Sequence, residues 1–198
     1  MQQNKVGAVT ASIIGILATK KEEEAAPFIY ALRHSIGKSL DEAMNVWPFF
    51  LEKMPVEFLS KNGKATQEER AIFTALQLYA IQQQGSKGQR ENGKEKNIGA
   101  SLRSIRTETT KSALDKRFLS MLSAKTFDAL VYHLWQITKL AKAKGANPVD
   151  FARLANDLFW YQRGRAQEIR LQWASSYYRY GDDNEDDAML ENNGRKNA

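Results

Sequence analysis

Hydrophobic residues recur along this chain with the spacing of helices. The clearest run lies between Ile72 and Ala80, where apolar residues share one face of a helix. Stretches that alternate apolar and polar residues between turn dipeptides, as strands do, are nearly absent. The pattern therefore predicts an all-α protein.

Capping residues and prolines place helix boundaries in the first half of the chain. Thr66 and Glu69 form a capping box, which predicts the start of the helix that carries Ile72. Pro27 suits a first helical turn, so a second helix is expected from there to Gly37. The other elements expected in this half are a buried helix over 6–18, a short helix over 40–47 and a packing turn over 48–55.

Capping residues and a glycine also place helix boundaries in the second half of the chain. Ser112 and Asp115 predict a capped helix start, and Gly164 is expected to break or bend a later helix. Asn147 is expected to cap the helix before that bend, with Asp150 at its third position. A long amphipathic helix between these two starts is predicted by Phe127, Leu130, Val131, Leu134 and Ile137.

A polar, glycine-punctuated stretch over 85–117 separates the two sets of helices. It holds nine Lys and Arg residues against four acids, a surplus of five positive charges. Such a stretch is too polar for a core, so we expect it on the surface. Its composition fits either an ordinary solvated loop or a strap that binds the phosphate backbone of a nucleic acid.

We therefore expect two packed helical bundles joined by a basic, glycine-containing connector. The expected parts are an N-terminal helical half over 1–84, the connector over 85–111, a C-terminal helical half over 112–180 and a disordered acidic tail over 181–198. The last 18 residues hold six acids and two bases, so the formal charge of +6 becomes +10 over residues 1–180. That surplus indicates a polyanionic partner.

Neither a membrane nor an oxidising compartment is indicated. The apolar run from Val6 to Ala18 is shorter than the roughly 20 residues that span a bilayer, and it leads into Lys20 and Lys21 without a convincing cleavage site. The absence of Cys rules out disulfides and thiolate metal sites, which suits a reducing cytoplasm. We expect a cytoplasmic protein whose first helix is buried.

Catalytic motifs are incomplete. Residues 88–95 nearly spell a P-loop, but Glu95 replaces the hydroxyl residue that the motif needs, and the segment follows a helix where the motif requires a strand. His34 and His133 lie far apart in the chain and lack the spacing of a zinc site. We therefore expect no nucleotide hydrolysis and no bound metal.

Carboxylates and aromatic rings have structural interpretations that compete with functional ones. Asp150 is explained by capping, and Asp157 and Glu168 are expected on polar helix faces near arginines, although a composite acid/base site stays open. Trp135 and Trp173 recur at core spacing and favour packing over base stacking. The role of the tyrosines at the end of the last helix is left open.

Several segments, taken in order, resemble the CasB family, the small subunit of the type I-E CRISPR Cascade complex. The likeness spans about residues 30–180 and rests on the order and spacing of helical packing patterns. The segments that carry it are ALRHSIGKSLDEAMNVWPFF (31–50), ALQLYAIQQQG (75–85), IGASLRSIR (98–106), DKRFLSMLSA (115–124) and FARLANDLFWYQRGRAQEIRLQWASSYY (151–178).

The resemblance implies a non-enzymatic, all-helical subunit without a cofactor. Two copies would sit in a guide-RNA-containing complex, in contact with its backbone and large subunits. A basic face would hold the target strand and the displaced non-target strand of the R-loop. The residues to which the resemblance assigns this role are Arg33, Lys38, Arg103, Arg106, Lys116, Arg117, Arg163 and Arg165.

Two other functions are compatible with the sequence. A stand-alone helical DNA-binding regulator or packaging protein would share the positive charge, but it would need a recognition helix that gives base preference. A carboxylate-dependent hydrolase would need a divalent metal for its turnover. A footprint on a defined site would indicate the first, and metal-dependent cleavage of a nucleic acid the second.

Overall fold

The structure is a computed structural model that describes residues 5–83 and 96–179. Its described residues form helices and turns with no strand, which confirms the all-α prediction. The α-helices are α1 (Lys5–Thr19), α2 (Glu22–His34), α3 (Trp47–Lys53), α4 (Gln67–Gln82), α5 (Ile98–Arg103), α6 (Lys111–Leu122), α7 (Phe127–Ala143), α8 (Phe151–Trp160) and α9 (Ala166–Tyr178). Two 3₁₀ turns, η1 (Met44–Val46) and η2 (Val56–Phe58), and a π-helical segment, η3 (Tyr161–Arg165), complete the fold. None of these helices is both long and apolar enough to cross a membrane.

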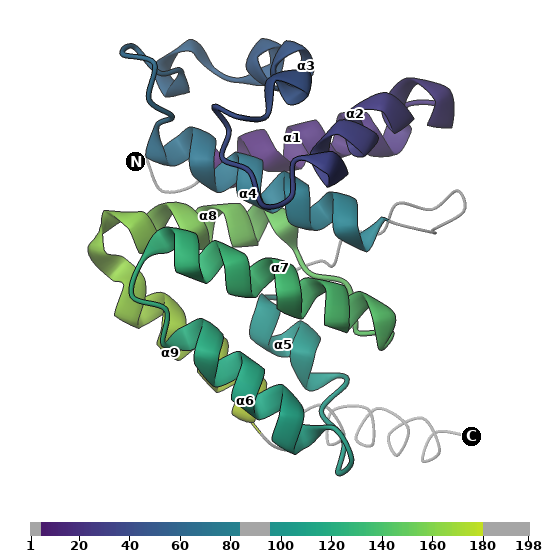
Figure 1. Ribbon diagram of the computed structural model, residues 1–198, viewed down its shortest axis with the longest axis vertical. Helices are drawn as coiled ribbons and strands as arrows, with labels where there is room; N and C mark the ends of the chain where they lie inside the picture. The colour runs from purple at the N-terminus through teal and green to yellow at the C-terminus, as the bar shows by residue number, and fades with distance from the viewer. Residues whose placement is uncertain (1–4, 84–95, 180–198) are drawn as a thin grey trace, which may run out of the picture.

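The two halves of the chain meet through α7 and α8. Helices α1, α4 and α8 pack against one another, α7 packs on α4 and α6, and α5 packs on α9 (Figure 1). The buried apolar side chains of both halves belong to one continuous cluster. The division into two bundles at residues 84 and 112 therefore stays a prediction, because the described core has no break between the halves.

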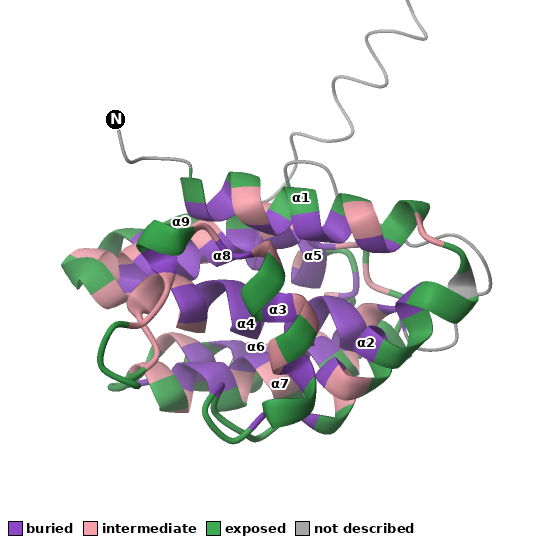
Figure 2. Ribbon diagram, turned by 90° about the horizontal axis from the view of Figure 1, so that it is seen from above, coloured by how far each residue is buried: buried purple, intermediate pink, exposed green. Residues whose placement is uncertain are grey.

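Helix α4 is the centre of this core. Every residue over 71–81 is buried, and Figure 2 shows α4 coloured as buried over most of its length. Its start is the predicted capping box: Glu69 N donates to Thr66 Oγ1 (3.1 Å), and Thr66 N donates to Glu69 Oε2 (2.7 Å). The second oxygen of Glu69 accepts from Ser60 N at 3.2 Å. The carboxylate can be buried because a backbone N–H group satisfies each of its oxygens.

Three predictions for the first half are wrong. Helix α2 starts at Glu22, so Pro27 lies inside it; the missing N–H removes only the bond to the carbonyl of exposed Glu23. The residues expected to form a helix over 40–47 form turns and η1 instead. The helix comes later, as α3, over residues expected to form a packing turn, and Pro48 occupies a first-turn position in it.

In the second half, two caps differ from the prediction and one bend is confirmed. The predicted capping residue Ser112 lies inside α6, Thr110 precedes this helix without a side-chain cap, and Asp115 is held by Arg106. Asp150, not Asn147, caps α8 by accepting from Arg153 N at 3.0 Å. Gly164 has a φ of 89°, a left-handed conformation that suits glycine, and it marks the bend between α8 and α9.

The connector is not wholly on the surface. The residues over 85–95 lie outside the described part of the chain, but Asn97, Ile98, Leu102 and Ile105 are buried. Asn97 caps α5 by accepting from Ala100 N (2.9 Å) and donates to Ser176 Oγ of α9 (2.8 Å). The expectation that the whole stretch stays out of the core is wrong, because its later part contains an apolar helical face that α9 covers.

Gly99 allows α5 to approach α9 closely. A Cβ atom at this position would lie 2.0 Å from the backbone oxygen of Trp173. No side chain fits there, so the two helix backbones touch only because residue 99 is glycine.

Gly99→Ala is expected to lower the free energy of unfolding by about 3 kcal/mol, since the methyl group forces α5 and α9 apart. Chemical denaturation followed by circular dichroism measures this. Gly15→Ala on the exposed face of α1 is the matched control, because a Cβ there meets nothing within 4 Å, and it should stabilise the protein slightly. Equal responses of the two variants would contradict the close approach.

Asp157 is buried, against the prediction of a polar face. It is 5% exposed and accepts a hydrogen bond from Nε1 of Trp173 at 2.8 Å. Trp173 itself is fully buried, which confirms its predicted packing role. Burial raises the pKa of Asp157 to about 6, and the bond from Trp173 and the charge of Arg153 offset only part of that.

Asp157→Asn is expected to stabilise the protein at pH 8 and to have little effect near pH 4. The native pKa lies above that of the unfolded chain, so wild-type stability falls as the pH rises from about 4 through 6, and asparagine removes this loss while keeping the bond from Trp173. The difference at pH 8 should approach about 3 kcal/mol. Unfolding curves at both pH values test this, and a stability difference that does not depend on pH would refute the assigned pKa.

Candidate nucleic-acid interface

The eight cations assigned by resemblance do not form one cluster. Arg163 and Arg165 lie at the bend before α9, whereas Arg103 and Arg106 contact its far end. A helix of 13 residues is about 20 Å long, so these two pairs are separated by that distance. Lys116 and Arg117 lie on α6, and Arg33 and Lys38 lie at the end of α2 and in the loop that follows.

Arg106 is committed to the fold. Its Nε and Nη2 donate to the two oxygens of Asp115, both at 2.8 Å, and its guanidinium lies over the rings of Tyr177 and Tyr178. The hydroxyl of Tyr177 donates to the same carboxylate at 2.6 Å. This bidentate, half-buried arrangement joins the end of α5 to α6 and α9.

No local pattern in the sequence signals this joint, because Arg106 precedes α6, Asp115 lies within it, and Tyr177 comes from α9, 62 positions beyond Asp115. The hydrogen bond from Arg106 lowers the pKa of Asp115 the most, and the bond from Tyr177 lowers it further. The ion pair and the two tyrosine rings occupy Arg106, so its assignment as a phosphate contact stays a prediction that this geometry does not favour.

Asp115→Asn should destabilise the protein by about 1–2 kcal/mol at pH 7, since it removes charge-assisted hydrogen bonds at a partly exposed site. The folded pKa of Asp115 is lowered, so its contribution is present above the unfolded pKa and is lost as the pH falls through the folded one. The melting temperatures of the two proteins should therefore converge as the pH falls from 7 to 3. Glu108→Gln, which breaks the more exposed pair with Lys111, is the control and should change little.

Arg103 and Arg33 each use part of their guanidinium group within the protein. Arg103 Nη1 donates to the backbone oxygen of Arg179 at 3.2 Å, and Arg33 Nε donates to the backbone oxygen of Ile29 at 3.4 Å. Both side chains are half-buried. Part of each guanidinium group is therefore unavailable to a phosphate.

Lys116 and Arg117 are the most available cations of the set. Helix α6 buries Leu114, Phe118 and Met121, which turns these two exposed residues away from the core. Neither makes an ion pair with any residue in the described part of the chain. They therefore present two positive charges that no described carboxylate neutralises.

The arginines at the bend are held against aromatic rings. Arg163 lies over Phe159 (5.4 Å) and reaches Gln67 Oε1 at 3.5 Å, while Arg165 lies over Trp160 (5.3 Å) and donates from Nε to Glu168 (2.8 Å). Glu168 raises the pKa of Arg165 by accepting this bond. An exposed ion pair of this kind is weak, so a phosphate can replace the carboxylate.

Lys38 lies in a different electrostatic environment. It lines a groove that also contains Asp41, Glu42 and Asp128. Ser39 donates to Glu42 from both its N–H and its hydroxyl, at 2.9 Å each, and these bonds lower the pKa of Glu42. The groove therefore contains carboxylates that would repel a phosphate chain.

The two histidines have local partners. His34 Nδ1 lies 2.9 Å from the backbone oxygen of Tyr30, and its ring lies against the Tyr30 ring. His133 meets the edge of Tyr132.

Over residues 5–83 and 96–179 there is no group of His, Asp and Glu side chains that could hold a metal ion. Trp135 is half-buried, which fits the predicted packing role only in part.

Residues 30–178 match the protein family described as CRISPR-associated protein Cse2. The chain belongs to the Cse2 family. This confirms the resemblance to CasB, which is the small subunit of the type I-E Cascade complex. Helix α1 lies before the matched residues, yet it packs on α4 and α8 within the same core.

Solved structures of Cse2 proteins share this fold. CasB from Thermobifida fusca is 24% identical, with a TM-score of 0.67 over 88% of this chain and 98% of that one. A CRISPR-associated protein of the Cse2 family from Thermus thermophilus is 22% identical, with a TM-score of 0.64 over 87% of this chain and 97% of that one. No curated protein matches the chain.

Proposed function

We propose that this Cse2-family chain is a non-catalytic subunit that holds the target and displaced DNA strands of an R-loop through contacts to their phosphates. The observation that carries the proposal is the exposed pair Lys116 and Arg117, whose charges no described carboxylate neutralises. Arg163 and Arg165, held on aromatic rings at the bend, form a second contact site.

The physical basis is the near balance of R-loop formation. Exchanging a DNA duplex for an RNA–DNA hybrid changes the free energy little, so a few cationic contacts to the separated strands can shift the equilibrium. Each neutralised phosphate releases condensed counterions whatever the base sequence. The guide RNA would read the sequence, and this subunit would stabilise the open state in the cytoplasm.

The partners follow from the same proposal. Two copies of the chain would lie along a guide-RNA-containing assembly, in contact with its backbone and large subunits and with both DNA strands. The described carboxylates give a hydrolase little support: Asp150 caps α8, Asp157 is buried against Trp173, and Glu168 pairs with Arg165. A stand-alone regulator would instead show a footprint on a defined DNA site.

Lys116→Glu with Arg117→Glu is expected to weaken single-strand DNA binding and to reduce the slope of log K against log salt concentration by about 1.4, since about 0.7 is lost for each single-strand phosphate contact. Fluorescence anisotropy at several salt concentrations measures the slope, and R-loop lifetime in the assembled complex should shorten. Arg163→Glu with Arg165→Glu should act in the same direction.

The matched control is Lys20→Glu with Lys21→Glu, which changes the net charge equally at the junction of α1 and α2. If binding depends on the position of the cations and not on net charge alone, this control should keep a normal slope and a normal R-loop lifetime. Unchanged values in both test variants, or an equal loss in the control, would count against the proposed interface.

A further inference from the structure

A groove of about 610 Å³ lies where the two halves of the chain meet. Its sides are the loops over 37–42 and 63–65, the part of α4 over 70–77 and the first half of α7. Its buried lining includes Leu40, Phe73 and Val131, and Trp135 is a half-buried wall. This volume accommodates a few amino-acid residues of a bound chain.

Two polar atoms of the groove lining have no hydrogen-bond partner among the described residues. Gln77 is 1% exposed, and its Nε2 donates to the backbone oxygen (2.7 Å) and hydroxyl (3.1 Å) of Ser35, which leaves Oε1 unpaired. The ring nitrogen of Trp135 is likewise buried and unpaired. One acceptor and one N–H donor, together the complement of an amide group, are therefore left without partners in the groove lining.

The charges around the groove are balanced. Three cations, at positions 38, 64 and 70, face three carboxylates, at positions 41, 42 and 128. Arg70 already pairs with Asp128 and lies over the ring of Phe127 (4.7 Å). A phosphate chain would meet the carboxylates, whereas a polypeptide of mixed charge fits both signs.

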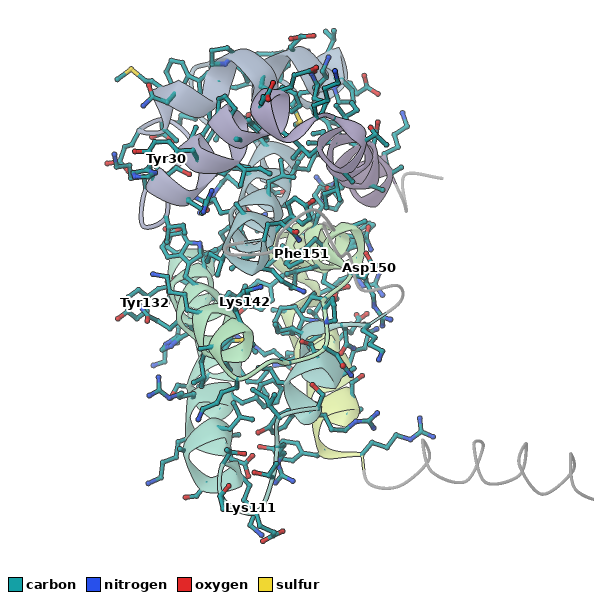
Figure 3. The ribbon with its side chains drawn as sticks, turned by 90° about the vertical axis from the view of Figure 1, so that its right-hand side faces the viewer. Tyr30, Lys111, Tyr132, Lys142, Asp150 and Phe151 are labelled. Carbon is teal, nitrogen blue, oxygen red and sulfur yellow. The ribbon has the colours of Figure 1, made fainter. Side chains whose placement is uncertain are left out.

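Exposed apolar side chains flank the groove. Tyr132 is 55% exposed beside it on α7. A second hollow of about 190 Å³ shares Lys38 and Glu42 with the groove, and Met44, which lines it, is 65% exposed. Tyr30, next to this hollow through its ring contact with His34, is 59% exposed. Figure 3 shows Tyr30 and Tyr132 projecting from the same side of the molecule.

We propose that this surface, the Tyr30–Tyr132 face, binds a polypeptide segment of a neighbouring protein subunit. The segment places an amide, from its backbone or from an Asn or Gln side chain, between Gln77 and Trp135, and the exposed Tyr and Met side chains cover it. Tyrosine and methionine are enriched in such interfaces. This inference rests on the proposed place of the chain in a complex of several subunits, and it is independent of the proposed DNA contacts.

The test uses the full-length chain and a guide-RNA-loaded assembly of the other Cascade subunits without DNA. Tyr132→Ser with Met44→Ser should weaken binding to that assembly at least about tenfold. Trp135→Phe keeps a ring but removes the N–H, and it should weaken binding about threefold or more. The melting temperature of the free Trp135→Phe protein should stay the same or rise, because an unpaired buried donor is removed.

Leu171→Ser is the matched control, since Leu171 is a comparably exposed apolar residue (69%) on α9, outside the groove and the hollow. It should bind the assembly normally, and single-strand DNA binding should be unchanged in all of these variants. Normal assembly by the Tyr132 and Met44 variant, or an equal loss with Leu171→Ser, would overturn the proposal. So would a loss of DNA affinity, which would assign the groove to nucleic acid, or a loss confined to self-association, which would assign it to a second copy of this chain.

Discussion

Burial of α4 on all sides is the constraint on which the rest of the structure depends. A helix whose residues over 71–81 are all buried needs neighbours in every direction, and α1, α2, α7 and α8 supply them. Two of these neighbours come from each half of the chain, so the halves cannot separate without exposing α4. The capping box at Thr66 and Glu69 fixes where this helix starts, and thereby where the flanking loops lie.

The same packing divides the positive charges into two kinds. Arg106 stabilises the contact of α5, α6 and α9 through Asp115 and Tyr177, so its charge is used inside the protein. Lys116 and Arg117 point away from that contact and are available to a partner. A count of cations in the sequence does not distinguish these kinds, because the distinction depends on which carboxylates fold next to which cations.

Two surfaces of different character result. The cations of α6 and of the bend suit a polyanion, whereas the Tyr30–Tyr132 face combines balanced charge, exposed aromatic and apolar side chains, and an unpaired donor and acceptor. The proposed contacts with a nucleic acid and with a protein segment would use these two surfaces separately. Their separation means that each can be altered without the other, which is the basis for telling the two proposals apart by mutation.

The sequence by itself determined the helical class, the long helices, the capping box of α4 and the bend at Gly164, because these depend on local spacing, capping and backbone conformation. The family resemblance could also be recognised from it. Only the tertiary structure decided that Asp115 binds Arg106 instead of capping α6, that Asp157 is buried, and that α5 enters the core against α9. Those outcomes depend on contacts between residues up to 79 positions apart, such as Asn97 with Ser176, and no local pattern encodes them.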